Sequence, residues 1–234
     1  MMRLEDKVAI VSGGSRGIGR AIVRALAAEG ASVVIAARDQ DALARTVAEL
    51  RKENLSVEGL VADVAVEAQV THLVQHVVHA HGRVDILVNN AGVGVFKPVA
   101  DLTVGDFDRM WGTNMRGVFL LTKAVLPHMI RTKSGQIVNI ASLAGKNSFK
   151  GGAGYCATKW ALRGFASSLM LEVREHNIRV MTVFPGSVET AFSASGKKGN
   201  NITQPEDVAD AVIFAVTAPA RSMFSEIDVR PTNP

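Results

Sequence analysis

Cysteine and tyrosine are nearly absent from this chain: its 234 residues include one of each, and aromatic side chains make up only 5%. A single Cys excludes an internal disulfide and a zinc site made of several cysteines, as expected in a reducing compartment. No apolar run approaches the ~20 residues that a membrane-spanning helix needs, and the first residues lack the pattern of a signal peptide. We therefore expect a cytoplasmic protein that does not bind membranes.

A strong charge imbalance is also missing, because 26 Lys and Arg residues oppose 22 Asp and Glu residues, for a formal net charge of +4. The basic residues are spread along the chain, so the sequence does not indicate nucleic-acid binding. Hydrophobic residues at 47% and charged residues at 21% are typical of a globular protein rather than a disordered one. Since the chain has no repeat, low-complexity tract or linker, we expect a single domain over residues 1–234.

Short runs rich in Val and Ile alternate with longer amphipathic stretches. The runs are apolar on both faces, as buried parallel strands are; they cover residues 7–12, 32–36, 56–61, 84–88, 136–140, 179–184 and 225–229. The amphipathic stretches have a helical period and cover residues 17–29, 40–53, 66–81, 105–131, 154–175 and 205–218. This alternation predicts an α/β fold of the Rossmann type: a doubly wound, seven-stranded parallel sheet with helices on both faces. Ligands of such sheets bind at the carboxyl ends of the strands.

A glycine-rich turn, SGGSRGIG, follows the first predicted strand and opens the first predicted helix. Gly13, Gly17 and Gly19 permit a tight turn and let a pyrophosphate approach backbone N–H groups and the positive helix end. Glycine turns also occur for packing reasons alone, but the strand–turn–helix context favours a dinucleotide site.

The end of the second predicted strand indicates which dinucleotide binds. A site for NAD usually places Asp or Glu there to accept the ribose 2′-OH, whereas this chain has the neutral Ala37 followed by Arg38. Arg38 can form a charge-assisted contact with a 2′-phosphate, and Arg16 in the glycine turn could reach the same phosphate. We therefore predict NADP(H); the alternative is that both arginines are merely solvated.

Two further strand ends carry residues suited to a dinucleotide. Asp63, followed by Val64, could accept a hydrogen bond from the adenine amino group, cap the next helix, or do both. After the fourth predicted strand, Asn90, Ala91 and Gly92 form a small-residue turn against which a ribose can lie.

Tyr155 and Lys159 are four residues apart in a predicted helix and therefore project from one face. A free phenol, with a pKa of about 10, is a poor base near pH 7, but a nearby ammonium lowers that pKa and favours proton exchange. Ser142 follows the fifth strand, where its hydroxyl can hydrogen-bond a substrate oxygen. Asn114 could hold a water that connects Lys159 to solvent. Each residue alone has an ordinary structural explanation, but together, behind a dinucleotide turn, they indicate a catalytic site.

In the order of these motifs, the chain resembles the short-chain dehydrogenase/reductase family over about residues 7–186. The motifs that carry the resemblance are SGGSRGIG, the AAR at the second strand end, DV at 63–64, NNAG at 89–92, Asn114, Ser142, YCATK at 155–159 and PGSVET at 185–190. Ser12 stands where the family commonly has Thr, and both residues carry a hydroxyl.

The resemblance implies a role for each residue. Ser142 orients the carbonyl, Tyr155 transfers the proton, Lys159 binds the nicotinamide ribose and lowers the tyrosine pKa, and Asn114 holds a relay water. The implied cofactor contacts are Gly13, Ser15, Arg16, Gly17, Ile18, Gly19, Arg38, Asp63, Val64, Asn90, Ala91, Gly92, Tyr155, Lys159, Pro185, Gly186, Val188 and Thr190. The resemblance also implies a homodimer or homotetramer and makes a 3-oxoacyl-thioester reductase the leading specific activity.

Substrate selectivity is expected from loops that follow the fourth, fifth and sixth strands. Phe96, Phe149 and Phe192 are the predicted walls of the substrate site, together with Ser142 and Tyr155, and residues 187–203 read as a lid. The loops also carry four lysines: Lys146, Lys150, Lys197 and Lys198. These could attract an anionic substrate or an acidic carrier protein, or they could be solvated charges.

Other features favour ordinary explanations. Four histidines at 72, 76, 79 and 81 share one predicted helix, but a solvated face explains them better than a metal site, and we predict no metal. The favoured function is an NADP(H)-dependent oxidoreductase that transfers hydride between the nicotinamide and a carbonyl or secondary alcohol. The main alternative is a non-enzymatic NADP(H)-binding sensor or scaffold, which need not keep Ser142, Tyr155 and Lys159 together. A sugar-nucleotide epimerase or dehydratase also uses a Tyr–Lys pair, but it resembles a longer branch with a separate substrate domain.

Overall fold

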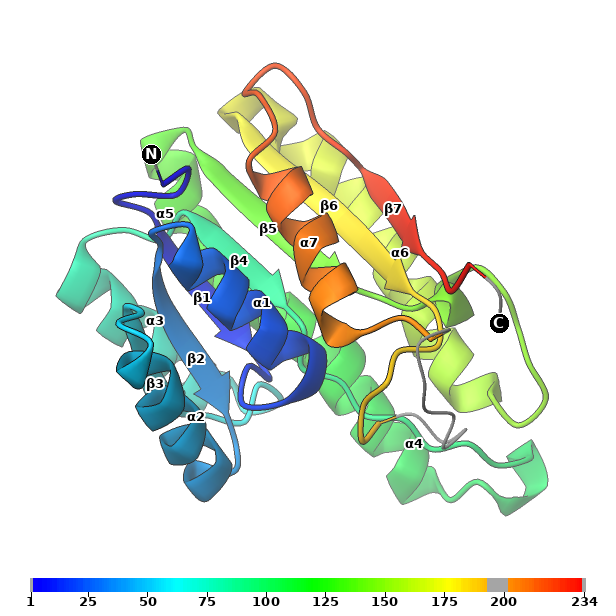
Figure 1. Cartoon of the computed structure of the whole chain (residues 1–234). Helices are drawn as coiled ribbons and strands as arrows, with labels where there is room; N and C mark the ends of the chain where they lie inside the picture. The colour runs from blue at the N-terminus through cyan, green and yellow to red at the C-terminus, as the bar shows by residue number, and fades with distance from the viewer. Residues whose placement is uncertain (1, 193–201, 233–234) are drawn as a thin grey trace.

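The computed structural model describes residues 2–192 and 202–232 of the chain. Within these residues, parallel strands form a seven-stranded sheet in the order β3-β2-β1-β4-β5-β6-β7 (Figure 1). The strands are β1 (Val8–Ser12), β2 (Ser32–Ala37), β3 (Val57–Val61), β4 (Ile86–Asn89), β5 (Gly135–Ile140), β6 (Ile178–Pro185) and β7 (Glu226–Val229). Each predicted strand is present with small shifts at its ends, and the doubly wound parallel sheet is confirmed.

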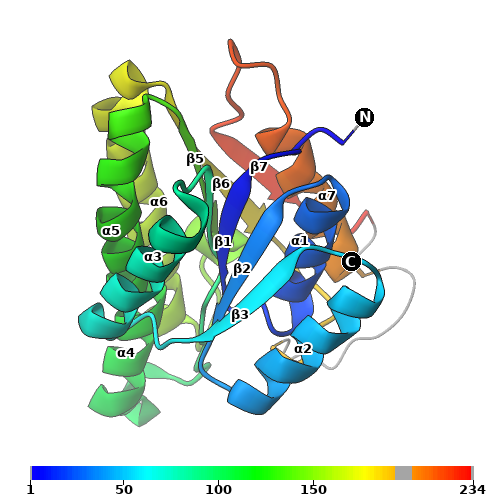
Figure 2. The same ribbon diagram turned by 90° about the vertical axis from the view of Figure 1, so that its left-hand side faces the viewer.

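Helices cover both faces of the sheet (Figure 2). They are α1 (Gly17–Ala28), α2 (Gln40–Lys52), α3 (Glu67–His81), α4 (Val104–Trp111), α5 (Gly117–Thr132), α6 (Ala153–Val173) and α7 (Pro205–Val216). The apolar residues of α1, α2 and α7 form one core with one face of the strands, and those of α3, α5 and α6 form a second core with the other face. Each fully buried Leu, Ile or Val contributes roughly 1.5–3 kcal/mol relative to an exposed side chain, so this two-sided packing holds the sheet rigid.

The long helix predicted over residues 105–131 differs from the structure. It is divided into α4 and α5 by a π-helical segment, Gly112–Arg116, in which the N–H of Gly117 donates to the carbonyl of Gly112. A π-helical turn holds one more residue than an α-helical turn and therefore shifts the faces of the helices on either side; such turns are frequent at functional sites. This segment contains Asn114.

The described ends of the predicted lid, residues 187–203, lie side by side. Val188 forms a parallel bridge with Thr203, and the N–H of Glu189 donates to the Thr203 carbonyl at 2.9 Å. Residues 193–201 of the predicted lid lie outside the described residues. Within residues 2–192 and 202–232, no helix has both the length and the hydropathy needed to cross a bilayer.

Candidate active site

The predicted site residues gather at the carboxyl ends of β1, β4, β5 and β6. β1 pairs with β2 on one side and with β4 on the other, so the order of the strands reverses between β1 and β4. In doubly wound sheets, a reversal of this kind opens a crevice in which a dinucleotide binds.

The glycine-rich turn after β1 has no room for a side chain at Gly13 or Gly19. Gly13 and Gly17 have φ values of 66° and 52°, in the left-handed region that favours glycine. A Cβ on Gly13 would lie 2.9 Å from the Ala91 Cα, and a Cβ on Gly19 would overlap the Gly13 carbonyl oxygen. The backbone therefore needs glycine at these positions in order to approach both the next turn and a ligand.

The glycine turn is joined to the Asn90–Ala91 turn after β4 by hydrogen bonds. The Ser12 hydroxyl accepts from the N–H groups of Asn90 and Ala91 at 3.0 and 3.1 Å. The Asn90 side-chain amide donates to the carbonyls of Ser12 and Gly13 at 3.0 and 3.1 Å. Ser12, which replaces the more common Thr, thus holds the two turns in a fixed relation.

The fit to a dinucleotide is good at the first turn of α1. The helix begins after Arg16, and no described side chain caps its N–H groups. The exposed Arg16 and the half-buried Ser15 and Ile18 surround this end. Thr190, from the segment after β6, comes close to it as well, since a Cβ on Gly17 would lie 3.3 Å from the Thr190 Cγ2. Free N–H groups and a positive helix end are what a pyrophosphate requires.

Arg38 and Asp63 lie together beyond the ends of β2 and β3. The Arg38 Nη1 is 3.6 Å from the Asp63 Oδ2, and the Arg38 side chain is 54% exposed. Asp63 does not cap α3 as one sequence interpretation suggested, because its Oδ1 accepts from the N–H of Ala65 at 2.9 Å, before the helix starts. The buried Val64 packs beside Gly117, where a Cβ would collide with it. A guanidinium that stays exposed in so loose an ion pair remains available to a phosphate.

The structure brings Ser142, Tyr155 and Lys159 together. Ser142 follows β5 and hydrogen-bonds the Tyr155 side chain, and its Oγ also accepts from the N–H of Ala144 at 3.1 Å. The Lys159 Nζ donates to the Ile140 carbonyl at 3.0 Å and lies 5.7 Å from the centre of the Tyr155 ring. Tyr155 and Lys159 are only 6% and 4% exposed, so their ionisation is governed by the protein.

The expected lowering of the Tyr155 pKa by Lys159 is not found in the structure. Burial raises the pKa of Tyr155 to about 12, and the hydrogen bond with Ser142 offsets only part of that rise. Burial also lowers the pKa of Lys159 to about 8. Both shifts have one physical cause, which is that the charged form of each group loses hydration inside the protein.

Asn114 links the loop after β4 to α6. Its amide nitrogen donates to the Val93 carbonyl at 2.9 Å and to the Thr158 hydroxyl at 3.0 Å, and its oxygen accepts from the N–H of Val93 at 2.8 Å. Gly92 lies within this arrangement, since a Cβ there would be 3.6 Å from the Asn114 Oδ1 and 3.8 Å from the Lys159 Nζ. Both N–H bonds of the amide are thus used to position the protein, and the relay-water role of Asn114 stays a prediction.

The segment after β6 approaches the site from the other side. Pro185 ends β6, and the N–H of Gly186 donates to the Val229 carbonyl at 2.8 Å. Val188 is buried in the core that α1 and α7 share. Thr190 is the residue of this segment that comes close to the glycine turn, at Gly17, and the cofactor contacts of Pro185, Gly186, Val188 and Thr190 stay predictions.

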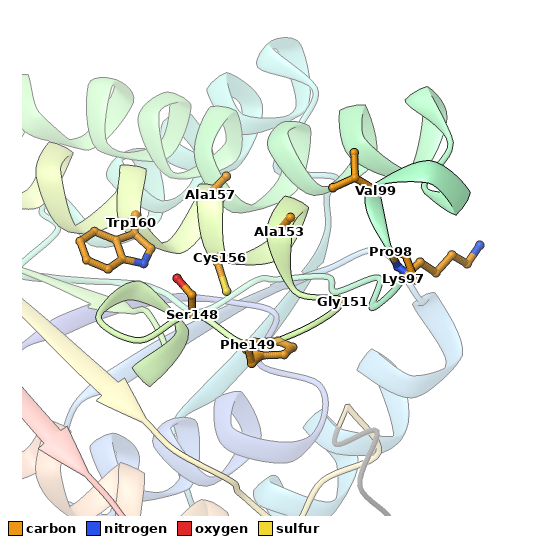
Figure 3. A pocket seen from close by; sticks show the side chains of 10 residues that line it. All are labelled: Lys97, Pro98, Val99, Ser148, Phe149, Gly151, Ala153, Cys156, Ala157 and Trp160. Atoms are coloured by element: carbon orange, nitrogen blue, oxygen red, sulfur yellow. The ribbon is translucent and has the colours of Figure 1, made fainter.

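Of the three phenylalanines predicted as substrate walls, two contact Tyr155 and the third contacts Phe96. The ring centre of Phe96 lies 5.3 Å from that of Tyr155, and the ring centre of Phe192 lies 5.9 Å from it. Phe149 contacts Phe96, with ring centres 5.7 Å apart. A cavity of about 470 Å³ lies beside Phe149, between the start of α6 and the loops that follow β4 and β5 (Figure 3). Ser142, Tyr155 and Lys159 do not line that cavity, so it is separate from the catalytic residues.

Lys146 has a role that sequence reasoning missed. Its Nζ lies 2.7 Å from the Asp228 Oδ1, 2.8 Å from the Glu226 Oε2 and 4.0 Å from the centre of the Phe184 ring. These contacts fasten the turn after Ser142 to β7, so Lys146 is not free to attract an anionic substrate. The acidic residues at alternate positions of β7, Glu226 and Asp228, were the sequence signal that could have predicted this role. Lys197 and Lys198 lie outside the described residues.

Two of the four clustered histidines, His76 and His81, lie close to the acidic side chain of Glu58. The Nε2 atoms of His76 and His81 lie 2.8 and 3.8 Å from the oxygens of Glu58. In the part of the chain that the structure describes, no group of three or more His, Cys, Asp or Glu side chains could hold a metal ion. The absence of a metal stays a prediction.

Fold and site together define a protein built to bind a dinucleotide beside a Ser–Tyr–Lys group. The family model for short-chain dehydrogenases matches residues 7–201, and the chain belongs to this family. An uncharacterized oxidoreductase of Staphylococcus aureus (strain MRSA252) is 34% identical over 99% of this chain and 100% of its own length. The uncharacterized oxidoreductase of Staphylococcus saprophyticus is 35% identical over the same shares of the two chains.

Solved structures of the family are also similar. A metagenomic short-chain oxidoreductase in complex with NADP has a TM-score of 0.89 and 39% identity, over 99% of this chain and 100% of its own. The alcohol dehydrogenase of the archaeon Thermococcus sibiricus, complexed with 5-hydroxy-NADP, has a TM-score of 0.91 and 33% identity, over 97% of each chain. An actinorhodin polyketide ketoreductase variant with NADPH has a TM-score of 0.90 and 33% identity, over 96% of each chain.

Proposed function

We propose that this protein is an NADP(H)-dependent oxidoreductase that interconverts a carbonyl and a secondary alcohol, with Tyr155 as the proton donor and acceptor. The observation that carries the proposal is the convergence of Ser142, Tyr155 and Lys159 beside a glycine turn that suits a pyrophosphate. A sensor or scaffold has no need for a buried phenol hydrogen-bonded to a serine at the mouth of a dinucleotide site.

The cofactor assignment rests on Arg38 and Arg16, which can bind a 2′-phosphate, and on the neutral Ala37. Three similar structures, described above, are complexes with NADP, a hydroxylated NADP or NADPH. When bound, the cofactor supplies the hydride or accepts it. By the family resemblance, we assign Asn90 to a ribose of the cofactor, Lys159 to the nicotinamide ribose and Val188 to the carboxamide.

The side chains of the site account for the proton. In the reducing direction, Ser142 hydrogen-bonds the carbonyl oxygen, and the phenolic proton of Tyr155 moves to that oxygen as hydride adds to the carbonyl carbon. With a pKa of about 12, the phenol is protonated at neutral pH and ready to donate. The phenolate left behind is stabilised by the ammonium of Lys159, and its proton is restored from solvent.

A 3-oxoacyl-thioester reductase is the specific activity that we propose to test first. The support is the subclass resemblance of the sequence and the similarity to a polyketide ketoreductase. Acetoacetyl thioesters and simple ketones in one panel, with NADPH oxidation as the readout, distinguish this activity from that of a general carbonyl reductase.

Tyr155→Phe tests the central claim with the smallest change, because it removes only the hydroxyl. We expect kcat to fall by about 1,000-fold or more, since general acid–base catalysis typically contributes 10²–10⁴-fold, while NADPH still binds. The measurement is NADPH oxidation with a carbonyl panel, paired with a fluorescence titration of NADPH. Activity near the wild-type level would refute the proton-transfer role, and wild-type protein that binds NADPH but reduces nothing would favour the sensor or scaffold.

The assembly is proposed on separate grounds. Phe119 on α5 and Trp160 and Leu171 on α6 are large apolar side chains that are about half exposed in the single chain. Exposed apolar side chains on neighbouring helices are suited to a subunit interface. They support the homodimer or homotetramer that the resemblance implies. The cytoplasmic location, the single domain over 1–234 and the lid over 187–203 stay predictions.

A further inference from the structure

Thr158 lies on α6 between Tyr155 and Lys159 and is fully buried. Its hydroxyl donates to the carbonyl of Tyr155 at 2.8 Å, and its Oγ1 accepts from the amide nitrogen of Asn114 at 3.0 Å. Because solvent does not reach the Thr158 side chain, this side chain acts on the site through the residues that it contacts.

The two hydrogen bonds of the Thr158 hydroxyl have a fixed direction. A hydroxyl has one proton, and Thr158 donates it to a carbonyl, which can only accept. The Thr158 Oγ1 therefore accepts from Asn114 and cannot donate to it. An Asn114 amide turned by 180° would bring its oxygen against the Thr158 oxygen, which places two acceptors together with no proton between them.

Asn114 requires a partner that sets its orientation. The last torsion of an Asn side chain has a broad, roughly two-fold preference, so the side chain alone does not select one orientation of its amide. Asn114 is only 1% exposed, and a buried amide in the wrong orientation leaves polar groups unpaired, which is costly. Since Asn114 belongs to the π-helical segment and Thr158 to α6, their hydrogen bond also joins two separate helices.

The Asn114 amide, in the observed orientation, holds the loop after β4. Its nitrogen donates to the Val93 carbonyl at 2.9 Å, and its oxygen accepts from the Val93 N–H at 2.8 Å. A Cβ on the preceding residue, Gly92, would lie 3.6 Å from the Asn114 Oδ1 and 3.8 Å from the Lys159 Nζ. Asn114 and Lys159 thus approach the same side of Gly92, and a turn of the amide would disturb the backbone beside the Lys159 ammonium.

We propose that Thr158 is a positioning residue of the reaction: its hydroxyl fixes the orientation of the Asn114 amide and, through this amide, the Gly92–Val93 backbone beside Lys159. The inference rests on the proposed function and adds to it a residue outside the Ser–Tyr–Lys group. Thr158 acts through Asn114 and is not itself a catalytic residue.

Thr158→Val tests the inference, because it keeps the shape of the side chain and removes the hydroxyl. We expect kcat for carbonyl reduction to fall by about tenfold or more, since displacement of a catalytic group by about 1 Å can cost about 100-fold. The KM for NADPH should change by less than about threefold, because Thr158 has no bond with the glycine turn. Thr158→Ser restores the hydroxyl and should return kcat to within about twofold of the wild-type value.

Wild-type kcat in Thr158→Val would overturn the inference, and so would a failure of Thr158→Ser to restore the rate. Thermal unfolding shows whether each variant is folded. If Thr158→Val does not fold, Thr158→Ala removes the same hydroxyl without a branched side chain and should give the same loss of kcat.

Thr122→Val is the matched control. Thr122 lies on α5, is 2% exposed, and its Oγ1 accepts from the amide nitrogen of Asn89 at 3.3 Å. This substitution also removes a buried hydroxyl from an Asn amide, but Asn89 keeps a second partner, the Asn139 oxygen at 2.9 Å. It should change kcat by less than about twofold. An equal loss of kcat in both variants would assign the effect of Thr158 to general loosening and would overturn the inference.

A double-mutant cycle with Asn114→Ala tests whether Thr158 acts through Asn114. If it does, Thr158→Val should lower kcat about tenfold or more in the wild-type background and by less than about twofold in the Asn114→Ala background. Equal losses in the two backgrounds would mean that Thr158 acts by another route, and the inference would be wrong.

Hydrogen exchange of the Val93 N–H separates the inference from the proposed function, because it needs no turnover. The N–H should exchange about tenfold faster or more in Thr158→Val than in the wild type or in Thr158→Ser, since its acceptor is no longer held. Wild-type protein that reduces no carbonyl but shows this pattern would refute only the proposed function. Equal exchange in all three proteins would overturn the positioning role of Thr158.

Discussion

The two halves of the site are built in different ways. The cofactor half consists of backbone and small side chains: the glycine turn after β1, and the Asn90–Ala91 turn that Ser12 holds beside it. The substrate half consists of large side chains: Tyr155 on α6, and Phe96, Phe149 and Phe192 from loops far apart in the sequence. Backbone cannot be exchanged by mutation, whereas loop side chains can, so the first half is suited to a constant ligand and the second to a changing one.

The largest expected effect comes from breaking the cofactor half. Gly19→Ala places a methyl group against the Gly13 carbonyl oxygen and the Asn90 amide. We expect NADPH affinity to fall by about 100-fold, because displacement of a site by about 1 Å can cost that much. Fluorescence titration of NADPH measures the change.

Gly105→Ala is the matched control, since a Cβ at Gly105 in α4 meets nothing within 4 Å. It should leave NADPH binding unchanged. Wild-type affinity in Gly19→Ala would mean that the turn can relax and that the cofactor half is less rigid than the structure indicates.

A second change alters the cofactor half without breaking it. The double variant Ala37→Asp/Arg38→Ile supplies an acceptor for a ribose 2′-OH and removes the cation that faces a 2′-phosphate. We expect the ratio of kcat/KM for NADPH to that for NADH to fall by about 10–100-fold, since a lost charged contact costs about 1.5–3 kcal/mol. An unchanged ratio, or wild-type enzyme that uses both cofactors equally, would contradict the role of Arg38.

Lys159, which lies beside Tyr155, should make the free energy of unfolding depend on pH. Burial lowers the pKa of Lys159 from 10.5 to about 8, so between these pH values the unfolded chain binds more protons than the folded protein. The free energy of unfolding of the unliganded protein should therefore rise with pH across that interval. From about pH 7.5 to about pH 9.5 the gain is roughly 2 kcal/mol.

Urea unfolding at the two pH values measures this gain, and Lys159→Met is the comparison that should lack it. Tyr155 has the opposite sign, because a folded-state pKa of about 12 lies above its usual 10.0. Its contribution is lost only as the pH rises from about 10 to about 12, above the range of the experiment. Equal pH dependence in both proteins would show that Lys159 does not carry the effect.

The smallest expected effect concerns the ion pairs that attach the turn after Ser142 to β7. Lys146→Met keeps the long apolar stem but removes the ion pairs with Glu226 and Asp228. We expect a loss of about 1 kcal/mol in stability, as for partly exposed ion pairs, and a few-fold lower kcat because the turn after Ser142 loses its attachment to β7. NADPH affinity should not change.

Lys150→Met, a change at an exposed lysine of the same loop, is the control for Lys146→Met. Unfolding curves and steady-state kinetics of the two variants show whether the ion pairs with β7 position Ser142. Identical behaviour would mean that the ion pairs with β7 do not position Ser142.

The same contrast explains what the sequence could predict. The strands and the glycine turn were predictable because they depend on local patterns: apolar runs, and glycines where φ is positive. The π-helical segment around Asn114 was not predictable, since an apolar period over 105–131 does not reveal one extra residue in a turn.

The contacts within the site were less predictable. Phe96, Phe149 and Phe192 were predicted as walls of the substrate site, but their mutual contacts depend on how three separate loops meet. The acidic residues of β7 were visible in the sequence, but their ion pairs with Lys146, about 80 positions away, depend on how the chain folds. The predicted lowering of the Tyr155 pKa by Lys159 is not found, because burial, which spacing alone does not measure, raises the pKa of Tyr155 to about 12.

Cys156 gives the start of α6 a built-in reporter. It is the one thiol of the chain, it lies next to Tyr155, and its side chain is only 6% exposed. Cys156 also lines the cavity beside Phe149 (Figure 3), so a thiol reagent that enters this cavity reaches the first turns of α6. The rate of its reaction therefore reports on access to the helix that carries Tyr155 and Lys159. That rate can be compared with and without NADP(H), without the introduction of any label.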